Sequence, residues 1–244
     1  MIKVLSIGNS FSQDAQRYLH GIAKADGINI RVVNLCIGGC SFDMHFRNML
    51  SKREAYSLEM NGDDTGFYVS LEQALLSQEW DYITLQQASH FSNNYGTYQP
   101  YLNEIASYVR KMCPNAKILI HETWAYEQDS GRLKNMGYTK AEDMLQDIQQ
   151  AYGAAKTDIG ADGVIASGSL FGDILSSGIS RIHRDTFHAS LGLGRYALGL
   201  LWYKTITGNS VMNNTFCDFD EVIEEEDIEI VKECVESKVC GKEK

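Results

Sequence analysis

Two stretches far apart in the chain carry residue types that could together perform nucleophilic chemistry. Ser10 follows closely on the apolar run 4–7, and Asp185 precedes His188 by three residues late in the chain. A carboxylate at that spacing can orient an imidazole, which can then accept the proton of a serine hydroxyl. These three residue types predict acyl transfer by a serine nucleophile.

The surroundings of Ser10 predict how it is positioned. The run 4–7 predicts a buried strand, Gly8 permits a sharp turn, and apolar residues at helical spacing from residue 15 predict a helix capped by Ser12 or Asp14. A strand, a turn and a helix N-terminus bring a hydroxyl to converging N–H groups, where negative charge is favoured. Taken alone, Ser10 is better explained as a turn serine that caps a helix.

Further apolar runs predict the rest of the sheet. Strands are expected at 28–34, 81–85, 117–120 and 163–166, with helices between most of them and an irregular segment at 42–66. This alternation predicts an α/β fold, a three-layer α/β/α sandwich with a five-stranded parallel sheet. Ligands in such folds bind at the carboxyl ends of the strands. The candidate loops are therefore residues 8–12, 38–41, 86–90 and 121–126.

The chain is expected to form one domain over residues 1–244. An acidic helix over residues 218–240 is expected to pack on that domain, with its charged side chains in solvent. We see no repeat and no convincing linker in the sequence.

The order of three motifs resembles the SGNH (GDSL-type) hydrolases. Residues 8–12, Gly-Asn-Ser-Phe-Ser, resemble the opening Gly-Asp-Ser-x-Ser block, and residues 185–188 match the closing Asp-x-x-His block. Residues 34–39 look like the second block, whose last glycine supplies an oxyanion N–H. The resemblance implies a flavodoxin-like SGNH fold in which Ser10 is the nucleophile, His188 the base and Asp185 its orienting carboxylate. It also implies that the N–H groups of Ser10 and Gly39 stabilise an oxyanion.

The chain departs from this family pattern at two places. Asn9 replaces the usual aspartate, and an amide can still brace the turn. The third block usually offers Gly-x-Asn-Asp with an asparagine oxyanion donor, whereas residues 86–89 are Gln-Gln-Ala-Ser. Gln86 is the expected replacement donor and Gln87 the second choice. A glutamine after this strand resembles the branch that acts on carbohydrate esters.

The resemblance implies a serine esterase that acts through an acyl-enzyme intermediate. The expected substrate is a small-molecule or carbohydrate ester carrying an O-acetyl group, with Gln87, Trp124 and Tyr126 as candidate substrate contacts. No metal and no organic cofactor is expected. The alternatives are a lipid esterase or thioesterase of the same superfamily, a flavodoxin-like flavin-binding protein, and a catalytically silent sugar-binding relative.

Two further histidines lie near the candidate loops and motifs. His121 and Glu122 end a strand, where a pocket role and a buried structural role are both open. His183 is expected at the surface or behind the reacting residues rather than as the base.

Composition and charge limit the partners. The 22 Lys and Arg against 32 Asp and Glu give a net charge of −10, which argues against nucleic acid and anionic membranes as partners. The first strand begins so early that a secretory segment has no room, so a cytoplasmic protein is expected. The six cysteines are expected to be free thiols rather than disulfides or zinc ligands. The oligomeric state is left open.

Overall fold

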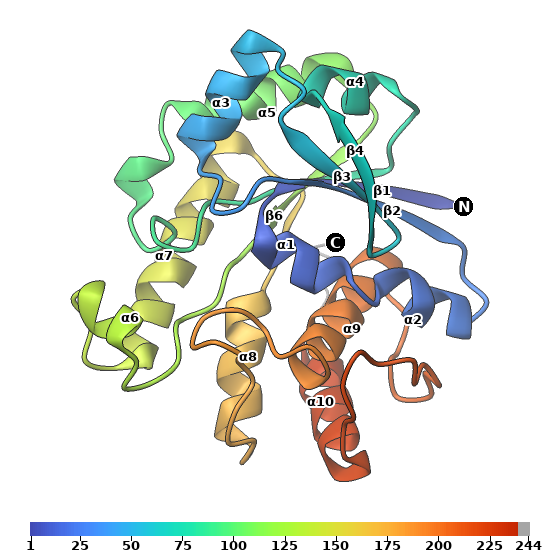
Figure 1. Cartoon of the computed structure of the whole chain (residues 1–244), viewed down its shortest axis with the longest axis vertical. Helices are drawn as coiled ribbons and strands as arrows, with labels where there is room; N and C mark the ends of the chain where they lie inside the picture. The colour runs from blue at the N-terminus through green and yellow to red at the C-terminus, as the bar shows by residue number, and fades with distance from the viewer. Residues whose placement is uncertain (239–244) are drawn as a thin grey trace.

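The apolar runs form the strands of one central sheet in the computed structural model, which describes residues 1–238 (Figure 1). β1 (Ile2–Gly8) lies between β2 (Ile30–Cys36) and β5 (Tyr82–Leu85), and β6 (Lys117–His121) and β7 (Gly163–Ile165) continue the sheet beyond β5. All four pairings among these strands are parallel. The predicted α/β sandwich is confirmed, with the strand that precedes Ser10 near its centre.

The sheet is larger than the five strands predicted. β3 (Tyr56–Met60) and β4 (Asp63–Val69) form an antiparallel hairpin that extends the sheet beyond β2, so the order is β4-β3-β2-β1-β5-β6-β7. The expectation of an irregular segment over 42–66 was therefore wrong. Asn61 and Gly62 both have positive φ, 54° and 92°, as a two-residue type I′ hairpin turn requires. β4 is a largely exposed edge strand, so it lacks the apolar pattern that identified the other strands.

Helices cover both faces of the sheet. On one face lie α1 (Ser10–Gln16), α2 (Leu19–Ala25), α8 (Ser167–Ser176), α9 (Leu193–Thr207) and α10 (Glu225–Ser237). On the other lie α3 (Phe42–Ser51), α4 (Leu71–Leu76), α5 (Tyr101–Met112) and α7 (Ala141–Ile159). The short helix α6 (Gly131–Asn135) and the 3-10 turn Tyr95–Thr97 lie in connections.

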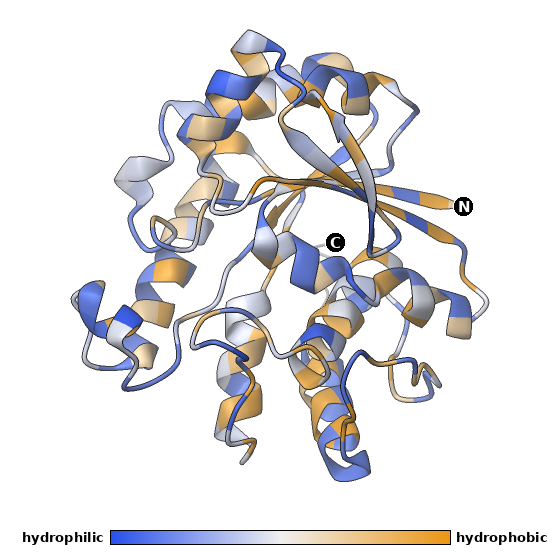
Figure 2. Cartoon of the chain, in the orientation of Figure 1, coloured by the Kyte–Doolittle hydropathy of each residue, from blue (hydrophilic) through white to orange (hydrophobic). Residues whose placement is uncertain are grey.

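Burial follows the hydropathy of the elements, with apolar residues along the sheet and on α9 (Figure 2). α9 is buried on most sides because it contacts α1, α2, α8 and α10. The acidic helix expected over 218–240 begins only at Glu225, and residues 239–240 lie outside the described residues. It packs on the domain through Val231, Cys234 and Val235.

None of the helices in residues 1–238 is both long enough and apolar enough to cross a membrane.

The hairpin turn provides a stability test of the fold. A Cβ added at Gly62 would lie 2.2 Å from the Arg17 carbonyl oxygen at the end of α1, whereas one added at Gly66 would have no neighbour within 4 Å. Both glycines have positive φ. Gly66→Ala should lower the free energy of unfolding by about 1 kcal/mol, the cost of left-handed backbone for alanine. Gly62→Ala should lower it by about 2–4 kcal/mol, because the backbone must also move. Urea denaturation measures both, and equal losses would contradict the packing of this turn on α1.

Candidate active site

The turn from β1 to α1 is fixed by side chains on both of its sides. Asn9, rather than Ser12 or Asp14, is the N-cap of α1, and Ser12 returns the bond by accepting the Asn9 N–H at 3.0 Å. Gly8 has no room for a side chain, since a Cβ there would lie 2.4 Å from Ser12 Oγ. Ser10 is consequently the first residue of the helix, half-buried at the carboxyl end of the central strand.

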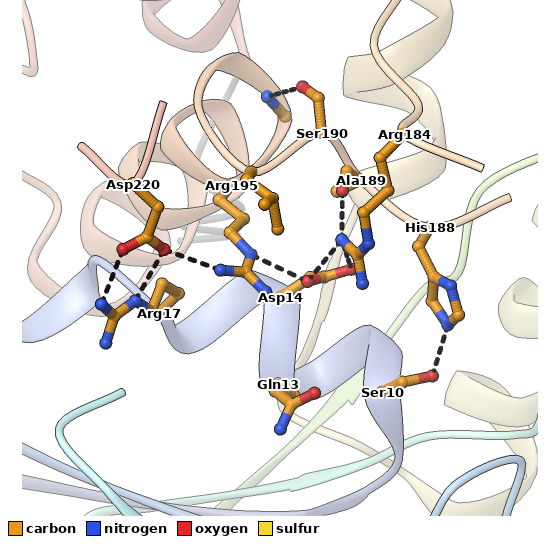
Figure 3. Close-up of polar contacts among 12 residues, drawn as sticks. Ser10, Gln13, Asp14, Arg17, Arg184, His188, Ala189, Ser190, Arg195 and Asp220 are labelled. Carbon is orange, nitrogen blue, oxygen red and sulfur yellow. Dashed lines mark hydrogen bonds and ion pairs between the residues drawn. The ribbon is translucent and has the colours of Figure 1, made fainter. Parts of the chain in front are cut away.

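Ser10, His188 and Asp185 meet although 178 residues separate the serine from the histidine. Ser10 Oγ lies 2.8 Å from His188 Nε2 (Figure 3). On the other side of the ring, His188 Nδ1 lies 2.7 Å from Asp185 Oδ2. The backbone N–H of His188 also donates to Asp185 Oδ1 at 2.9 Å. With Nδ1–H donated to the carboxylate, Nε2 presents its lone pair to the serine hydroxyl. This is the geometry in which an imidazole removes a serine proton.

Asp185 is suited to hold a positive imidazole. Its limited burial acts to raise its pKa, but the hydrogen bonds from the His188 side chain and backbone outweigh this, so the pKa lies below its usual value. The carboxylate is therefore ionised at neutral pH.

A buried ion pair joins α1 to the loop that carries Asp185 and His188. The Asp14 side chain is fully buried, and Arg184 Nη1 donates to both of its oxygens at 2.9 Å while Arg195 Nε donates to Oδ1 at 2.9 Å (Figure 3). Arg184 also donates to the carbonyl oxygen of Ala189, the residue after His188, so it contacts the loop on both sides of the histidine. Arg195 continues the network to Asp220 at 2.7 Å. No sequence pattern indicated this network, because its members are far apart and follow no motif.

Gly39 lies in the turn after β2, beside the Ser10 loop. Ile37 N donates to Gly8 O at 3.4 Å, and Asn9 Nδ2 donates to Cys40 O at 3.2 Å, which ties the two loops together. Gly39 is exposed, with φ of 64°, and its N–H makes no backbone hydrogen bond within the described part of the chain. An N–H in this position is available to a ligand, as the family resemblance implies.

The two glutamines after β5 face into the protein, contrary to their expected roles. Gln86 is fully buried, and its Nε2 donates to His121 Nδ1 at 2.9 Å. Gln87 is also fully buried; its Oε1 accepts the N–H groups of Phe42 and Ala88, and its Nε2 donates to Thr97. These amides brace loops, so neither is offered to a substrate beside Ser10.

The two aromatic residues expected to contact substrate, Trp124 and Tyr126, are buried and pack behind the site. Trp124 has no exposed area; it stacks on Phe11 with ring centroids 4.1 Å apart, and its Nε1 donates to the Phe187 carbonyl oxygen at 2.7 Å. It therefore backs the loop of His188 instead of facing solvent. Tyr126 is 4% exposed, and its hydroxyl lies 3.0 Å from Ser89 Oγ.

The strand-end histidine is a buried structural residue. His121 has no exposed area, its Nε2 lies 3.0 Å from Ser167 Oγ, and burial lowers its pKa to about 3. It is thus neutral and holds Gln86 beneath the β1 turn. His183 is buried as well, with Nε2 3.1 Å from Ala125 O, so it is not at the surface.

Neither a metal cluster nor a disulfide is found in residues 1–238. No group of three or more His, Cys, Asp or Glu residues there could hold a metal ion. The five cysteines within this range are free, and Cys240 lies outside it. A cavity of about 900 Å³ lies between α7 and α8 and is lined partly by Tyr126 and His183, but Ser10 and His188 do not line it.

Comparison with known proteins identifies a family and a fold. The family model of DUF4886, a domain of unknown function, matches residues 3–235. The crystal structure of a DUF4886 family protein from Bacteroides uniformis ATCC 8492 is 32% identical, with a TM-score of 0.89, covering 96% of this chain and 93% of that one. No curated protein sequence matches the chain.

More distant structures share the architecture. A proposed SGNH hydrolase from Slackia heliotrinireducens is 21% identical with a TM-score of 0.61, covering 84% of this chain and 98% of that one. A proposed GDSL-like lipase from Parabacteroides merdae ATCC 43184 is 14% identical with a TM-score of 0.57, covering 85% of this chain and 95% of that one. At these identities the likeness is one of fold, and it confirms the resemblance to SGNH hydrolases at that level.

Arg184 and Arg17 provide a matched pair for testing the buried network. Arg184→Gln should lower the free energy of unfolding by about 3 kcal/mol, because it removes one partner of the buried Asp14 carboxylate. Arg17→Gln should cost at most about 1 kcal/mol, because its partner Asp63 is exposed and its partner Asp220 is partly exposed. The downfield NMR signal of the His188 Nδ1 proton should broaden or vanish only in Arg184→Gln. Retention of that signal in both variants would show that the network does not position the histidine.

Glu122 provides a pH test. It is 4% exposed, and burial raises its pKa to about 7 against the hydrogen bonds from Ser169. Because the folded pKa lies above the unfolded one, the folded state binds the extra proton between about pH 4.5 and pH 7, and stability falls as pH rises through this window. Glu122→Gln should remove about 2–3 kcal/mol of that fall, measured by urea unfolding at several pH values. Parallel stability curves for the variant and the parent would contradict this.

Proposed function

The chain belongs to the DUF4886 family and has the SGNH hydrolase fold, and from its site geometry we propose that it is a serine esterase acting on small acyl esters. The observation that supports this most strongly is the 2.8 Å contact between Ser10 Oγ and His188 Nε2, with Asp185 on the opposite nitrogen.

In the first half of the reaction Ser10 Oγ attacks the ester carbonyl carbon, and its proton passes to His188 Nε2. Asp185, ionised and 2.7 Å from Nδ1, stabilises the resulting imidazolium. When the tetrahedral intermediate collapses, the alcohol leaves with the proton from His188. The acyl group remains on Ser10 as an ester.

In the second half, water attacks this acyl-enzyme and gives its proton to His188. The serine then leaves as a hydroxyl by recovering that proton, and the carboxylic acid is released. Both halves pass through an oxyanion, for which the N–H groups of Ser10 and Gly39 are the proposed donors. Each such donor is worth about 3 kcal/mol in comparable sites. Gln86 is not among them, since its amide is buried on His121.

We infer a short acyl group, in particular an acetyl group on a carbohydrate. Support for the short acyl group comes from the cavity between α7 and α8, the place where a long chain could be buried, because neither Ser10 nor His188 lines it. Trp124 is also fully buried beneath the site, so it provides no apolar surface against which an acyl chain could pack. The carbohydrate part rests on the sequence resemblance.

Ester hydrolysis should depend on all three residues. The parent protein should release p-nitrophenol from the acetate faster than from the octanoate, and should release acetate from acetylated sugars. Ser10→Ala and His188→Ala should each lower kcat about 10,000-fold or more, because neither residue replaces the other. Asp185→Asn should lower kcat by a similar factor through the wrong imidazole tautomer.

The control variant is His183→Gln, which changes a histidine of the same segment that does not contact Ser10. This variant should keep the parent's kcat. Faster octanoate turnover would instead favour a lipid esterase. Unchanged turnover in Ser10→Ala would refute the esterase altogether.

A further inference from the structure

The connection from β6 to α7 forms a second wall beside the loop of His188. Glu127 N donates to Thr186 O at 2.8 Å, and Trp124 Nε1 donates to Phe187 O at 2.7 Å. These bonds hold residues 124–127 and 186–187 together, and α6 follows directly after this contact. Side chains of α6 are thereby brought to the His188 side of the site.

Arg132, on α6, places a positive charge next to the catalytic imidazole. Its guanidinium carbon lies 3.8 Å from the centre of the Phe187 ring, and the Phe187 and His188 ring centres are also 3.8 Å apart. The charge therefore lies one aromatic ring beyond the imidazole. Its proximity to Tyr126 is consistent with this, because burial raises the pKa of that phenol and the charge of Arg132 opposes the rise.

The N–H donors of Arg132 are free, unlike those of the other arginines around the site. Arg181 pairs with Glu127, and Arg184 and Arg195 pair with Asp14. The Arg132 side chain makes no hydrogen bond or ion pair with any residue in 1–238, and it is exposed. Stacking on an aromatic ring orients the guanidinium plane and leaves its N–H groups pointing outward in that plane. A guanidinium presented in this way matches a carboxylate, which can accept two parallel N–H bonds.

The reaction places the alcohol part of the ester on this side. His188 Nε2 must protonate the leaving oxygen, so the alcohol lies next to the imidazole, and Arg132 lies just beyond Phe187. Resting on the esterase function proposed above, we propose that the alcohol part of the substrate carries a carboxylate that Arg132 binds. The substrate class is then the acetyl ester of a hydroxy acid, for which an O-acetylated sugar acid is the carbohydrate case.

A pair of matched esters tests this inference. 4-Acetoxybenzoate and 4-acetoxybenzamide have the same shape and differ in the charge of the group on the alcohol side. The parent should prefer the benzoate, and the ratio of kcat/KM for benzoate to that for benzamide should fall about tenfold in Arg132→Gln, chiefly through KM. Arg132→Lys should retain part of the preference, and added salt should reduce it in the parent.

Lys134→Gln is the control, because Lys134 is a second exposed cation on the same short helix; this variant should keep the parent's ratio. A ratio in Arg132→Gln equal to that of the parent, or an equal loss on both esters, would overturn the carboxylate site.

A binding measurement separates this inference from the esterase proposal. Ser10→Ala should bind 4-hydroxybenzoate more tightly than 4-hydroxybenzamide by calorimetry, and the double variant Ser10→Ala, Arg132→Gln should lose that preference. If the parent hydrolyses neither ester but the binding preference depends on Arg132, the esterase fails and the carboxylate site stands. If turnover occurs but neither turnover nor binding depends on Arg132, the carboxylate site fails and the esterase stands.

Discussion

The site depends on the Asp14 carboxylate, which is fully buried between two guanidinium groups. A buried charge is tolerated only when it is paired and hydrogen-bonded, so α1 and the loop carrying Arg184 must fold against each other. Asp14 lies one helical turn from Ser10, and Arg184 is followed at once by Asp185. The same ion pair that satisfies Asp14 therefore sets the distance between the Ser10 hydroxyl and the His188 imidazole.

The layer beneath the site is built to be neutral and closely packed. Gln86, His121 and Ser167 form a buried hydrogen-bonded chain under the β1 turn, with His121 kept neutral by burial. Gly8 has no side chain that could push this layer and the Ser10 loop apart. The charged groups beside His188 are Asp185, which contacts its Nδ1, and Arg132, which lies beyond the Phe187 ring. A neutral support lets the charge that appears on the imidazole interact mainly with Asp185.

Much of the fold and the meeting of Ser10, Asp185 and His188 could be predicted, because they follow local rules. Ser10 lies just after a central strand, and Asp185 and His188 are close in sequence, so short motifs identify them. The roles of Gln86 and Trp124 could not be predicted in this way. Strands in the middle of a parallel sheet are buried on both faces. A polar side chain that follows such a strand can point into the core or toward the site, and the sequence pattern is the same in both cases. Pairings such as Asp14 with Arg184 span 170 residues and leave no spacing signal. The β3–β4 hairpin was missed because its outer strand is polar and exposed, although its Asn61-Gly62 turn was visible.

Activation of Ser10 by His188 is the central claim, and covalent labelling tests it most directly. A fluorophosphonate probe reacts with a serine whose proton is taken by a neighbouring imidazole, and peptide mass spectrometry locates the modified residue. The geometry predicts a single modification on Ser10 in the parent protein and none in His188→Ala. A folded parent protein that stays unlabelled at Ser10, or a label there that persists without His188, would contradict this mechanism.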